Sequence, residues 1–401
     1  MVTVDVTYDV GSRVEPPGKT GFAHLFEHLM FEGSENVGKG EHFKHVAEAG
    51  GTMNGTTSED RTNYFETLPA ECFEMGLFLE ADRMRALVLS EEKLINQREA
   101  VKEEKRLRVD NQPYAKSFEV TDDLAYDSFP YKHPVIGSMD DLDAASIEDA
   151  REFYNRYYAP GNALLCICGE LEPEDAMTKV RRWFDEIPAR ATWQPEMPQE
   201  PEPTGVERRA QISDPHAAVP AVHVNFKVKE RRHPDVLALT YVEKVLCGGE
   251  SGRLWRKLVK DEEKALSVTV TIDERRGPSL FRVFALARPG TSPELLEEDV
   301  KAELARVISE GPSEREMERA RRMLMADALR TVQTTQSVAF LLSEYGVYDG
   351  DPGLWREDFE RILSFSASEV RDAAARCFVT SRSSVVTVLP GTPGTPMQEI
   401  A

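Results

Sequence analysis

The sequence predicts an α+β fold made of two similar α/β units. Strand-like alternation and helix-like periodicity follow one another along the chain. The order of elements partly repeats in the second half, and a segment rich in proline and acidic residues separates the halves. A chain of 401 residues also exceeds one hydrophobic core. We therefore expect a domain over 1–187, a linker over 188–215 and a second domain over 216–401.

The first half alternates strands and helices. Residues 2–9 alternate like a strand, and Gly50-Gly51 ends a stretch of helical periodicity. The elements expected in order are a strand over 2–9, helices over 21–30 and from 41 onward, two short strands within 52–68, helices over 70–88, 90–109 and 147–158, a buried strand over 162–169 and a helix over 173–187.

The second half begins with the same order and then adds helices. Its histidines His216, His223 and His233 show no ligand spacing, so we expect no metal site there. The expected elements are a strand over 218–228, a helix over 233–247, strands over 266–273 and 279–287, helices over 293–310, 313–331, 334–347 and 354–376, and a last strand over 383–389.

The helix expected over 21–30 carries the motif H-x-x-E-H. His24 and His28 are four residues apart, so one helical face presents both imidazoles. Two neutral imidazoles supply half of a tetrahedral zinc site. Glu27 lies near the same face, where a carboxylate can accept a proton from a metal-bound water. The alternative is an amphipathic helix with two structural histidines, but the pattern is that of the inverzincins.

A third ligand is expected on the helix over 90–109. Leu94, Gln97, Val101, Glu104 and Arg108 are spaced three or four apart and form one inward stripe. A carboxylate on such a stripe is costly unless it is paired or binds a metal. Glu104 is therefore the expected third zinc ligand, which leaves a fourth position for water. Gln97, two turns earlier, is expected to hydrogen-bond a ligand. The alternative for Glu104 is a surface ion pair.

Composition excludes several classes of protein. Hydrophobic residues make up 41% and charged residues 30% of the chain, which is typical of soluble proteins, and no apolar run is long enough to span a membrane. A net charge of −21 argues against a nucleic-acid partner and is compatible with a basic peptide substrate. The first residues do not read as a signal peptide. We expect a cytoplasmic protein, or a periplasmic one if the N-terminus is trimmed.

The cysteines do not suggest a disulfide framework, because the set is odd in number and scattered. Cys166 and Cys168 lie in the strand over 162–169, and we expect their side chains on opposite faces, which argues against a shared metal. Buried free thiols in a reducing compartment are the expectation. The five residues are Cys72, Cys166, Cys168, Cys247 and Cys377.

Six stretches of the chain, beginning with the H-x-x-E-H helix, carry a resemblance to a known family. The chain resembles the pitrilysin–insulinase–mitochondrial processing peptidase family, in its shorter bacterial branch, as the zinc-bearing subunit of the heterodimeric type. The resemblance covers nearly the whole chain, and the 76-residue separation of Glu104 from His28 (104 − 28) fits the family. The stretches are Gly18–Phe31, Met53–Ser58, Arg61–Tyr64, Gln97–Glu104, Tyr157–Ala163 and Gly249–Leu254.

The resemblance implies a fold and a mode of substrate binding. It implies two homologous α/β domains, each an antiparallel-rich sheet flanked by helices, that form a clam-shell half-chamber with zinc on the N-terminal domain. It also implies that a peptide substrate adds as an extra strand along Asn54, Gly55 and Thr56. The alternative for these three residues is a plain hairpin strand.

The chain departs from the family pattern in three places. The family usually has an acid where this chain has Gln97. Its C-terminal domain usually supplies an arginine and a tyrosine, where this chain has Glu263 and Ser267. The family also usually begins with a further strand before residue 2. The resemblance therefore implies a homologous zinc-less partner subunit that supplies the Arg/Tyr pair, or a homodimer.

These observations predict a zinc-dependent metalloendopeptidase with one Zn²⁺ per chain. We expect it to cleave unfolded peptides or leader segments, with Glu27 as the proton acceptor and a homologous partner needed for full activity. The alternative is a non-catalytic or assembly subunit of a processing-peptidase-like complex. A small-molecule metal hydrolase finds no support beyond the ligands themselves.

Overall fold

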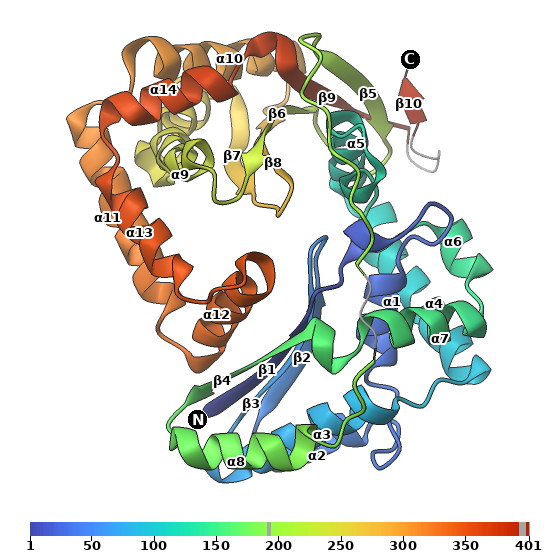
Figure 1. Ribbon diagram of the computed structural model, residues 1–401. Helices are drawn as coiled ribbons and strands as arrows, with labels where there is room; N and C mark the ends of the chain where they lie inside the picture. The colour runs from blue at the N-terminus through green and yellow to red at the C-terminus, as the bar shows by residue number, and fades with distance from the viewer. Residues whose placement is uncertain (191–193, 393–397, 401) are drawn as a thin grey trace. The chain divides into compact units, whose positions relative to one another are not determined.

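The computed structural model describes residues 1–190, 194–392 and 398–400, and it divides the chain into two compact units. Unit 1 consists of Met1–Lys105, Phe129–Pro198 and Leu329–Trp355, and unit 2 of Arg106–Ser128, Gln199–Ala328 and Arg356–Ala401. Each unit contains one sheet flanked by helices (Figure 1). Among the described residues, no helix combines the length and apolar character that crossing a membrane requires.

The sheet of unit 1 has four antiparallel strands in the order β2-β3-β1-β4. Strand β1 is interior and pairs with β3 on one side and β4 on the other, while β2 and β4 form the two edges. Its apolar residues are fully buried, as the alternating sequence predicts. The strands are β1 (Val2–Tyr8), β2 (Thr52–Thr57), β3 (Thr62–Leu68) and β4 (Ala163–Gly169).

Helices of the first half build the core of unit 1. Aromatic side chains from α1, α7 and the strands stack in it, with Phe26 against Phe153 and Tyr158 at centroid distances of 5.1 Å. This core fixes α1, which carries the H-x-x-E-H motif. The helices are α1 (Phe22–Leu29), α2 (Glu41–Glu48), α3 (Phe73–Ala86), α4 (Glu91–Lys105), α6 (Met139–Ala144), α7 (Ile147–Tyr157) and α8 (Pro173–Phe184).

A helix from the second half of the chain, α12 (Thr335–Asp349), also packs on the sheet of unit 1. Ser343 Oγ donates a 2.5 Å hydrogen bond to the buried Asp5 carboxylate of β1. The Phe340 and Phe65 rings meet edge to face with centroids 4.6 Å apart. This face of the sheet is therefore covered by a segment that lies beyond the linker in sequence.

Unit 2 contains a six-stranded sheet in the order β10-β5-β9-β6-β8-β7, in which only the β5–β9 pair among the described strands is parallel. The strands are β5 (Arg208–Asp214), β6 (Ala221–Glu230), β7 (Ala265–Asp273), β8 (Pro278–Ala287), β9 (Ser383–Pro390) and β10 (Gln398–Ile400). The later helices are α9 (Pro234–Cys247), α10 (Pro293–Glu310), α11 (Glu314–Thr331), α13 (Leu354–Ser364) and α14 (Ala367–Cys377).

The two units exchange one helix each. Helix α5 (Ala115–Ala125) precedes the linker but packs on strands of unit 2, where Ser117 Oγ lies 2.7 Å from Nε2 of the buried His223 on β6. The bond between Ser343 of α12 and Asp5 of β1 is its counterpart in unit 1. The predicted domains, 1–187 and 216–401, are each one continuous segment, so they do not describe this exchange of helices.

Three further expectations differ from the structure. Strand β5 lies inside the segment predicted as a linker. The prediction was wrong there because the prolines and acidic residues around this short strand dominate the composition of the segment. The helix expected over 354–376 is two helices, α13 and α14. Cys166 and Cys168 lie on the same face of β4 with their sulfurs 3.8 Å apart, since residues two apart in a strand share a face.

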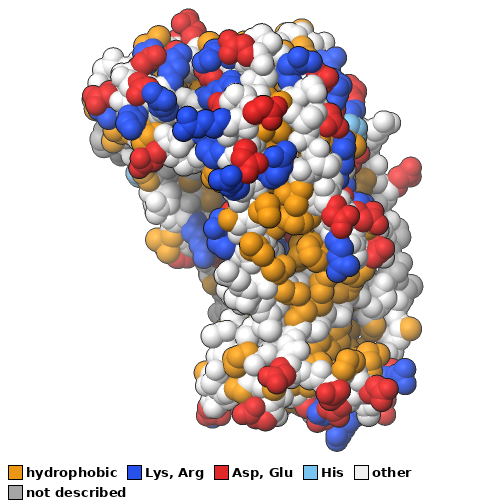
Figure 2. Space-filling model, turned by 90° about the vertical axis from the view of Figure 1, so that its left-hand side faces the viewer, with side chains coloured by type: hydrophobic (Ala, Val, Ile, Leu, Met, Phe, Trp, Pro, Cys, Tyr) orange, Lys and Arg blue, Asp and Glu red, His pale blue; other side chains and the backbone are white. Residues whose placement is uncertain are grey.

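The outer surface carries some exposed apolar side chains. Met325 and Leu329 are four residues apart near the end of α11, Val332 follows the helix directly, and all three are exposed. Figure 2 shows hydrophobic side chains gathered on the face that includes the α11 side of the molecule.

Candidate metal centre

Helix α1 is fixed at its start and along its apolar face, which orients its histidines. Gly21 precedes it with φ 88°, and a Cβ there would lie 2.8 Å from the Ile136 carbonyl oxygen, so only glycine suits this position. Phe22, Leu25, Phe26 and Leu29 are buried. His24 and His28 share the remaining face, with their ring centroids 5.1 Å apart.

Helix α4 brings Glu104 to the two imidazoles. Glu104 Oε2 lies 3.1 Å from His28 Nε2 and 3.6 Å from His24 Nε2, and one ligand atom from each residue lies within 4.8 Å of the others. Ligand atoms around a tetrahedral zinc ion are about 3.3 Å apart, because each Zn–N or Zn–O bond is about 2 Å long. The donor set and its spacing therefore fit zinc.

The predicted stripe on α4 ends sooner than expected. Leu94 and Val101 are buried as predicted, but Arg108 is exposed because α4 ends at Lys105 and continues as a π-helical turn over Arg106–Asp110. Glu104 is the last inward carboxylate before this change.

Gln97 contacts the second histidine. Its Oε1 lies 3.3 Å from His28 Nδ1, and its Nε2 donates to Glu32 Oε1 at 2.8 Å. If His28 Nδ1 donates to this amide oxygen, Nε2 is left deprotonated and faces the metal position. Lys39 holds the other oxygen of Glu32 at 2.7 Å. The sequence did not indicate this extension to Glu32 and Lys39.

Glu27 lies beside the ligands and contacts strand β2. Thr57 Oγ1 donates to Glu27 Oε2 at 2.6 Å. Burial raises the pKa of Glu27, while the Thr57 hydroxyl and His28 lower it and the Glu104 carboxylate raises it further. Thr57 was not predicted as a site residue. It lies two residues after Gly55 and therefore points to the same face of β2.

The predicted substrate residues lie on β2, an edge strand of the sheet. Ser58 N donates to Arg61 O, so Ser58 and Arg61 form a hydrogen-bonded pair of the β2–β3 hairpin. Hydrogen-bonded and non-hydrogen-bonded pairs alternate from there, which makes Gly55 and its partner on β3 a non-hydrogen-bonded pair. The backbone N–H and C=O of Gly55 therefore point away from β3, toward the open edge of the sheet. The Gly55 N–H meets the side-chain oxygen of Asn54 at 3.0 Å. Thr56 projects to the opposite face, where Arg61 Nη1 donates to its Oγ1 and carbonyl oxygen.

A pocket of about 290 Å³ opens next to Glu27 and His28. Phe31 and Phe43 form its apolar walls, and their rings lie 5.0 Å apart. Asn54 of β2 also lines it. The pocket can therefore receive one side chain of a peptide that lies along β2. Neither phenylalanine was singled out from the sequence.

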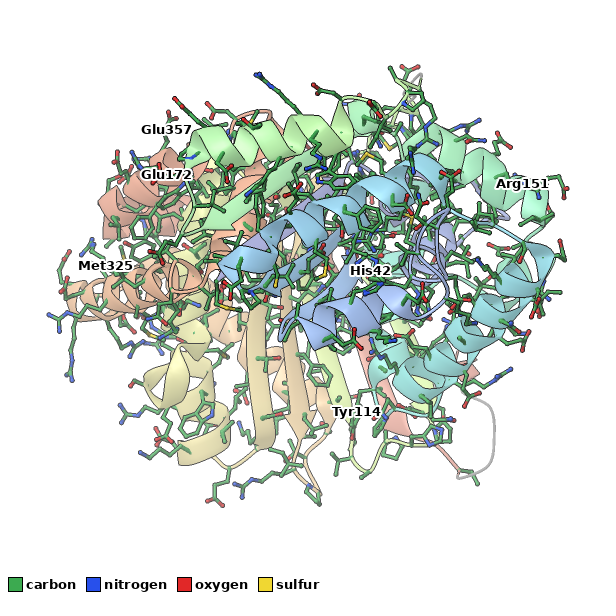
Figure 3. All side chains as sticks on the ribbon, turned by 90° about the horizontal axis from the view of Figure 1, so that it is seen from below. His42, Tyr114, Arg151, Glu172, Met325 and Glu357 are labelled. Atoms are coloured by element: carbon green, nitrogen blue, oxygen red, sulfur yellow. The ribbon has the colours of Figure 1, made fainter. Side chains whose placement is uncertain are left out.

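A second group of potential ligands consists of His42, Glu66 and Glu80, which are all buried; His42 is labelled on α2 in Figure 3. Here a cation is already present, because Arg83 Nε donates to Glu80 at 2.9 Å. Burial and the neighbouring Glu80 raise the pKa of Glu66, which favours the neutral form of this carboxyl group. The guanidinium of Arg83 therefore occupies the role of cation in this cluster.

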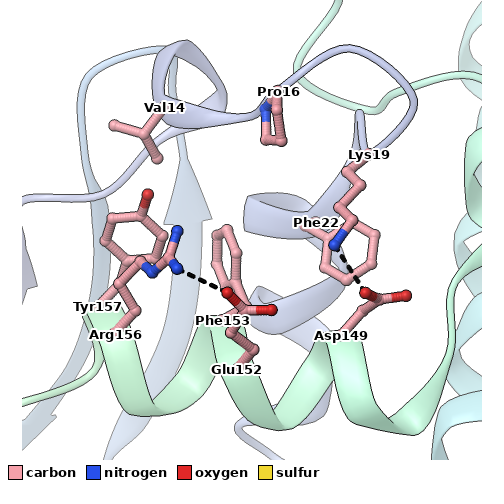
Figure 4. Close-up of a pocket in the computed structure, with 9 residues that line it drawn as sticks. All are labelled: Val14, Pro16, Lys19, Phe22, Asp149, Glu152, Phe153, Arg156 and Tyr157. Carbon is pink, nitrogen blue, oxygen red and sulfur yellow. Dashed lines mark hydrogen bonds and ion pairs between the residues drawn. The ribbon is translucent and has the colours of Figure 1, made fainter. Parts of the chain in front are cut away.

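A smaller pocket of about 50 Å³ lies between the loop before α1 and helix α7 (Figure 4). Its charged side chains pair with each other, Lys19 with Asp149 at 2.7 Å and Arg156 with Glu152 at 2.6 Å. The pocket supports the start of α1 and presents no arrangement for chemistry.

Comparison with protein-family models matches both halves of the chain. Residues 1–138 match the model described as insulinase (peptidase family M16), and residues 144–324 match the model described as peptidase M16 inactive domain. Together the two matches span nearly all of residues 1–324. The chain belongs to the insulinase family, peptidase family M16.

Relatives and solved structures agree with this assignment. The chain is 29% identical to the zinc protease PqqE of Helicobacter pylori, over 97% of this chain and 88% of the relative. It is 21% identical to a probable mitochondrial-processing peptidase subunit beta of Arabidopsis thaliana, over 93% and 71%. A crystal structure of a protease from Helicobacter pylori superposes with a TM-score of 0.93 at 28% identity, covering 97% of this chain and 94% of that one.

A more distant structure shows the same fold. The peptidase M16 inactive domain from Pseudomonas fluorescens superposes with a TM-score of 0.86 at 16% identity, covering 98% of this chain and 94% of that chain.

Proposed function

We propose that this chain is a zinc-dependent metalloendopeptidase. The observation that carries the proposal is the convergence of His24, His28 and Glu104 with Glu27 beside them, next to the open edge of β2. The name of the Helicobacter pylori relative, a zinc protease, supports zinc as the metal.

The residues of the chain would divide the chemistry between them. His24, His28 and Glu104 would hold the ion. When bound, zinc polarises a substrate carbonyl and lowers the pKa of a water molecule. Glu27 then accepts the proton of the attacking water and passes it to the leaving amine. The Thr57 hydroxyl keeps the Glu27 carboxylate in place through its 2.6 Å bond.

The substrate would be an unfolded peptide or leader segment. Its backbone pairs with the outward-facing groups of Gly55 on β2, while Asn54 and Thr56 flank that position. One of its side chains enters the pocket between Phe31 and Phe43. The net charge of −21 favours peptides with basic residues.

Full activity would require a partner subunit. Ser267 is exposed on β7, and Glu263 pairs with Arg288 at 3.1 Å, so neither side chain supplies the phenol or guanidinium expected from the family resemblance. A homologous zinc-less subunit that provides an Arg/Tyr pair would complete the site. The description of one matched relative as a subunit supports this arrangement.

The test compares cleavage of an unfolded basic peptide by wild type, Glu27→Gln and Glu103→Gln, with and without a homologous zinc-less subunit. Glu103 is an exposed carboxylate next to Glu104 and serves as the control. The proposal expects cleavage by wild type and Glu103→Gln and a loss of at least about a hundredfold in Glu27→Gln. Undiminished cleavage by Glu27→Gln would refute it.

The same experiment tests the non-catalytic alternative, which the match of 144–324 to a domain described as inactive favours. A zinc-loaded chain that cleaves no peptide, even with the homologous subunit present, would assign it to assembly.

A further inference from the structure

The metal-bearing helix is capped by a residue outside it. The residue before α1 is Gly21, which has no side chain to cap the helix. Glu15 takes this role, since its Oε2 accepts from Gly21 N at 2.8 Å and its Oε1 from Ala23 N at 2.7 Å. Both carboxylate oxygens are thus directed at the first turn of α1, immediately before His24. The Glu15 side chain is fully buried.

A buried histidine faces this carboxylate. His133 Nε2 lies 3.0 Å from the Ser12 carbonyl oxygen and 3.2 Å from Glu15 Oε2, and Nδ1 lies 2.9 Å from the Phe129 carbonyl oxygen. Carbonyl oxygens only accept hydrogen bonds, so both ring nitrogens must donate. A ring that donates from both nitrogens is an imidazolium. Phe129 stacks on the ring with centroids 4.4 Å apart.

We infer that Glu15 and the His133 imidazolium form a charged clamp that positions helix α1, and that loss of the His133 proton loosens it. Both residues are positioning residues, because they act on the ligands through the backbone of Gly21 and Ala23. The consequence for zinc rests on the proposed function, whereas the charged pair itself does not.

The charge of the pair follows from its surroundings. Burial disfavours the imidazolium, but the Glu15 carboxylate and the carbonyls of Phe129 and Ser12 outweigh it, so the pKa of His133 is raised above 6.5. Burial raises the pKa of Glu15, which His133 and the N–H groups of Ala23 and Gly21 oppose.

Neighbouring ionisable groups do not compete for His133. Arg13 of the preceding turn pairs with Asp9 and Asp60, at 3.2 and 2.9 Å. Tyr131 Oη donates to the same Asp60 at 2.8 Å. Burial raises the pKa of Tyr157 of α7, and the nearby Glu15 carboxylate adds a smaller increase. Glu15 is therefore the charged partner that decides the protonation of His133.

The sign of the pH effect follows from the raised pKa of His133. The contribution of the His133 charge to folding is fully present below pH 6.5 and is lost as pH rises through the higher pKa of this residue in the folded protein. Above that pH, the Glu15 carboxylate is left without its cation in a buried place.

The charge of His133 is measured by nuclear magnetic resonance on the full chain with labelled histidines. The His133 signals are assigned by their loss in His133→Gln. We expect both ring nitrogens to be protonated at pH 7, with titration above the ordinary value, and we expect the pKa to fall below 6.5 in Glu15→Gln. A neutral His133 ring at pH 7, or an unchanged pKa in Glu15→Gln, would overturn the inference.

The positioning role is measured by zinc affinity between about pH 7 and 9.5, a range that lies above the ordinary pKa of a histidine side chain. Wild type and His216→Gln, an exposed histidine of unit 2, should lose about tenfold in affinity across this range. His133→Gln should bind weakly throughout, with a flat profile. A His133→Gln profile parallel to wild type would overturn the role. If no variant binds zinc, the proposed function fails, and the resonance experiment still decides the charged pair.

Discussion

At the residue scale, the site depends on the absence of a side chain at Gly55. A Cβ at this position would lie 3.0 Å from Glu27 Cγ, 3.2 Å from Tyr64 Cδ1 and 3.3 Å from Phe31 Cε2. These distances are tighter than ordinary contacts, so Glu27 or the strand must shift. The same glycine faces the open edge of β2, where a substrate would pair.

Gly55→Ala should therefore lower peptide cleavage more than it lowers stability. We expect a loss of about tenfold or more in kcat and a loss of about 1 kcal/mol in unfolding free energy, because the displaced group is the proton acceptor. Steady-state kinetics and urea unfolding measure the two effects. The control is Thr52→Ala, at the exposed start of the same strand. Equal kcat values for Gly55→Ala and Thr52→Ala would contradict the account.

The environment of Gln97 favours a neutral amide over the acid that the family resemblance implies at this position. Gln97 Nε2 donates to Glu32 at 2.8 Å, and an acid at this position would face the Glu32 carboxylate. We expect Gln97→Leu to weaken zinc binding about tenfold, because His28 loses its partner at 3.3 Å. Gln97→Glu should also weaken binding, and Glu32→Gln combined with Gln97→Glu should restore it. Competition with a chelator measures each affinity, and a lack of restoration would refute the explanation.

At the scale of elements, helix α12 is held on the sheet by a buried acid. Asp5 accepts from Ser343 at 2.5 Å, Thr7 at 2.9 Å and Asn63 at 2.8 Å. Burial raises the pKa of Asp5 to about 6, although these three hydrogen bonds oppose the change. Asn63 in turn accepts from Thr56 on the edge strand, so the contact with α12 reaches the proposed substrate strand.

The raised pKa predicts a pH effect on stability with a definite sign. The folded state binds the Asp5 proton more tightly than the unfolded state, so its contribution is present below about pH 4 and is lost as pH rises through about 6. Between about pH 5 and 7.5, the unfolding free energy of wild type should fall by on the order of 1 kcal/mol relative to that of Asp5→Asn.

Urea unfolding at both pH values measures this effect. Asp185→Asn, an exposed aspartate, is the matched control and should follow wild type. If the difference in unfolding free energy between wild type and Asp5→Asn is the same at both pH values, Asp5 keeps an ordinary pKa and the prediction is wrong.

Local patterns in the sequence were enough to predict the elements of the site. Helical spacing predicts that His24 and His28 share a face, and the apolar stripe on α4 predicts that Glu104 points inward. The structure brings these three side chains together. Spacing alone does not say which sheet a helix covers. Helix α12 has nearly the predicted bounds, but its contacts with Asp5 and Phe65 are more than 270 residues distant in sequence.

At the scale of the whole molecule, the exchange of α5 and α12 makes each unit depend on both halves of the chain. A fragment of residues 1–198 lacks α12, so Asp5, Thr3 and Phe65 each lose the partner that this helix supplies. We expect this fragment to lack a cooperative unfolding transition, and the same fragment with 329–355 joined by a flexible linker to recover one. Near-ultraviolet circular dichroism during heating measures both. Cooperative unfolding of 1–198 alone would contradict the division into units.

The central claim is that residues from α1 and α4 together hold one zinc ion. The most direct measurement is the zinc content per chain of wild type, Glu104→Gln and Glu103→Gln after equilibration with a weak chelator. The geometry predicts one zinc ion in wild type and Glu103→Gln and a loss in Glu104→Gln, because the Glu104 carboxylate lies 3.1 Å from His28 Nε2 and 3.6 Å from His24 Nε2. Zinc retained equally by Glu104→Gln, or absent from wild type, would contradict the account.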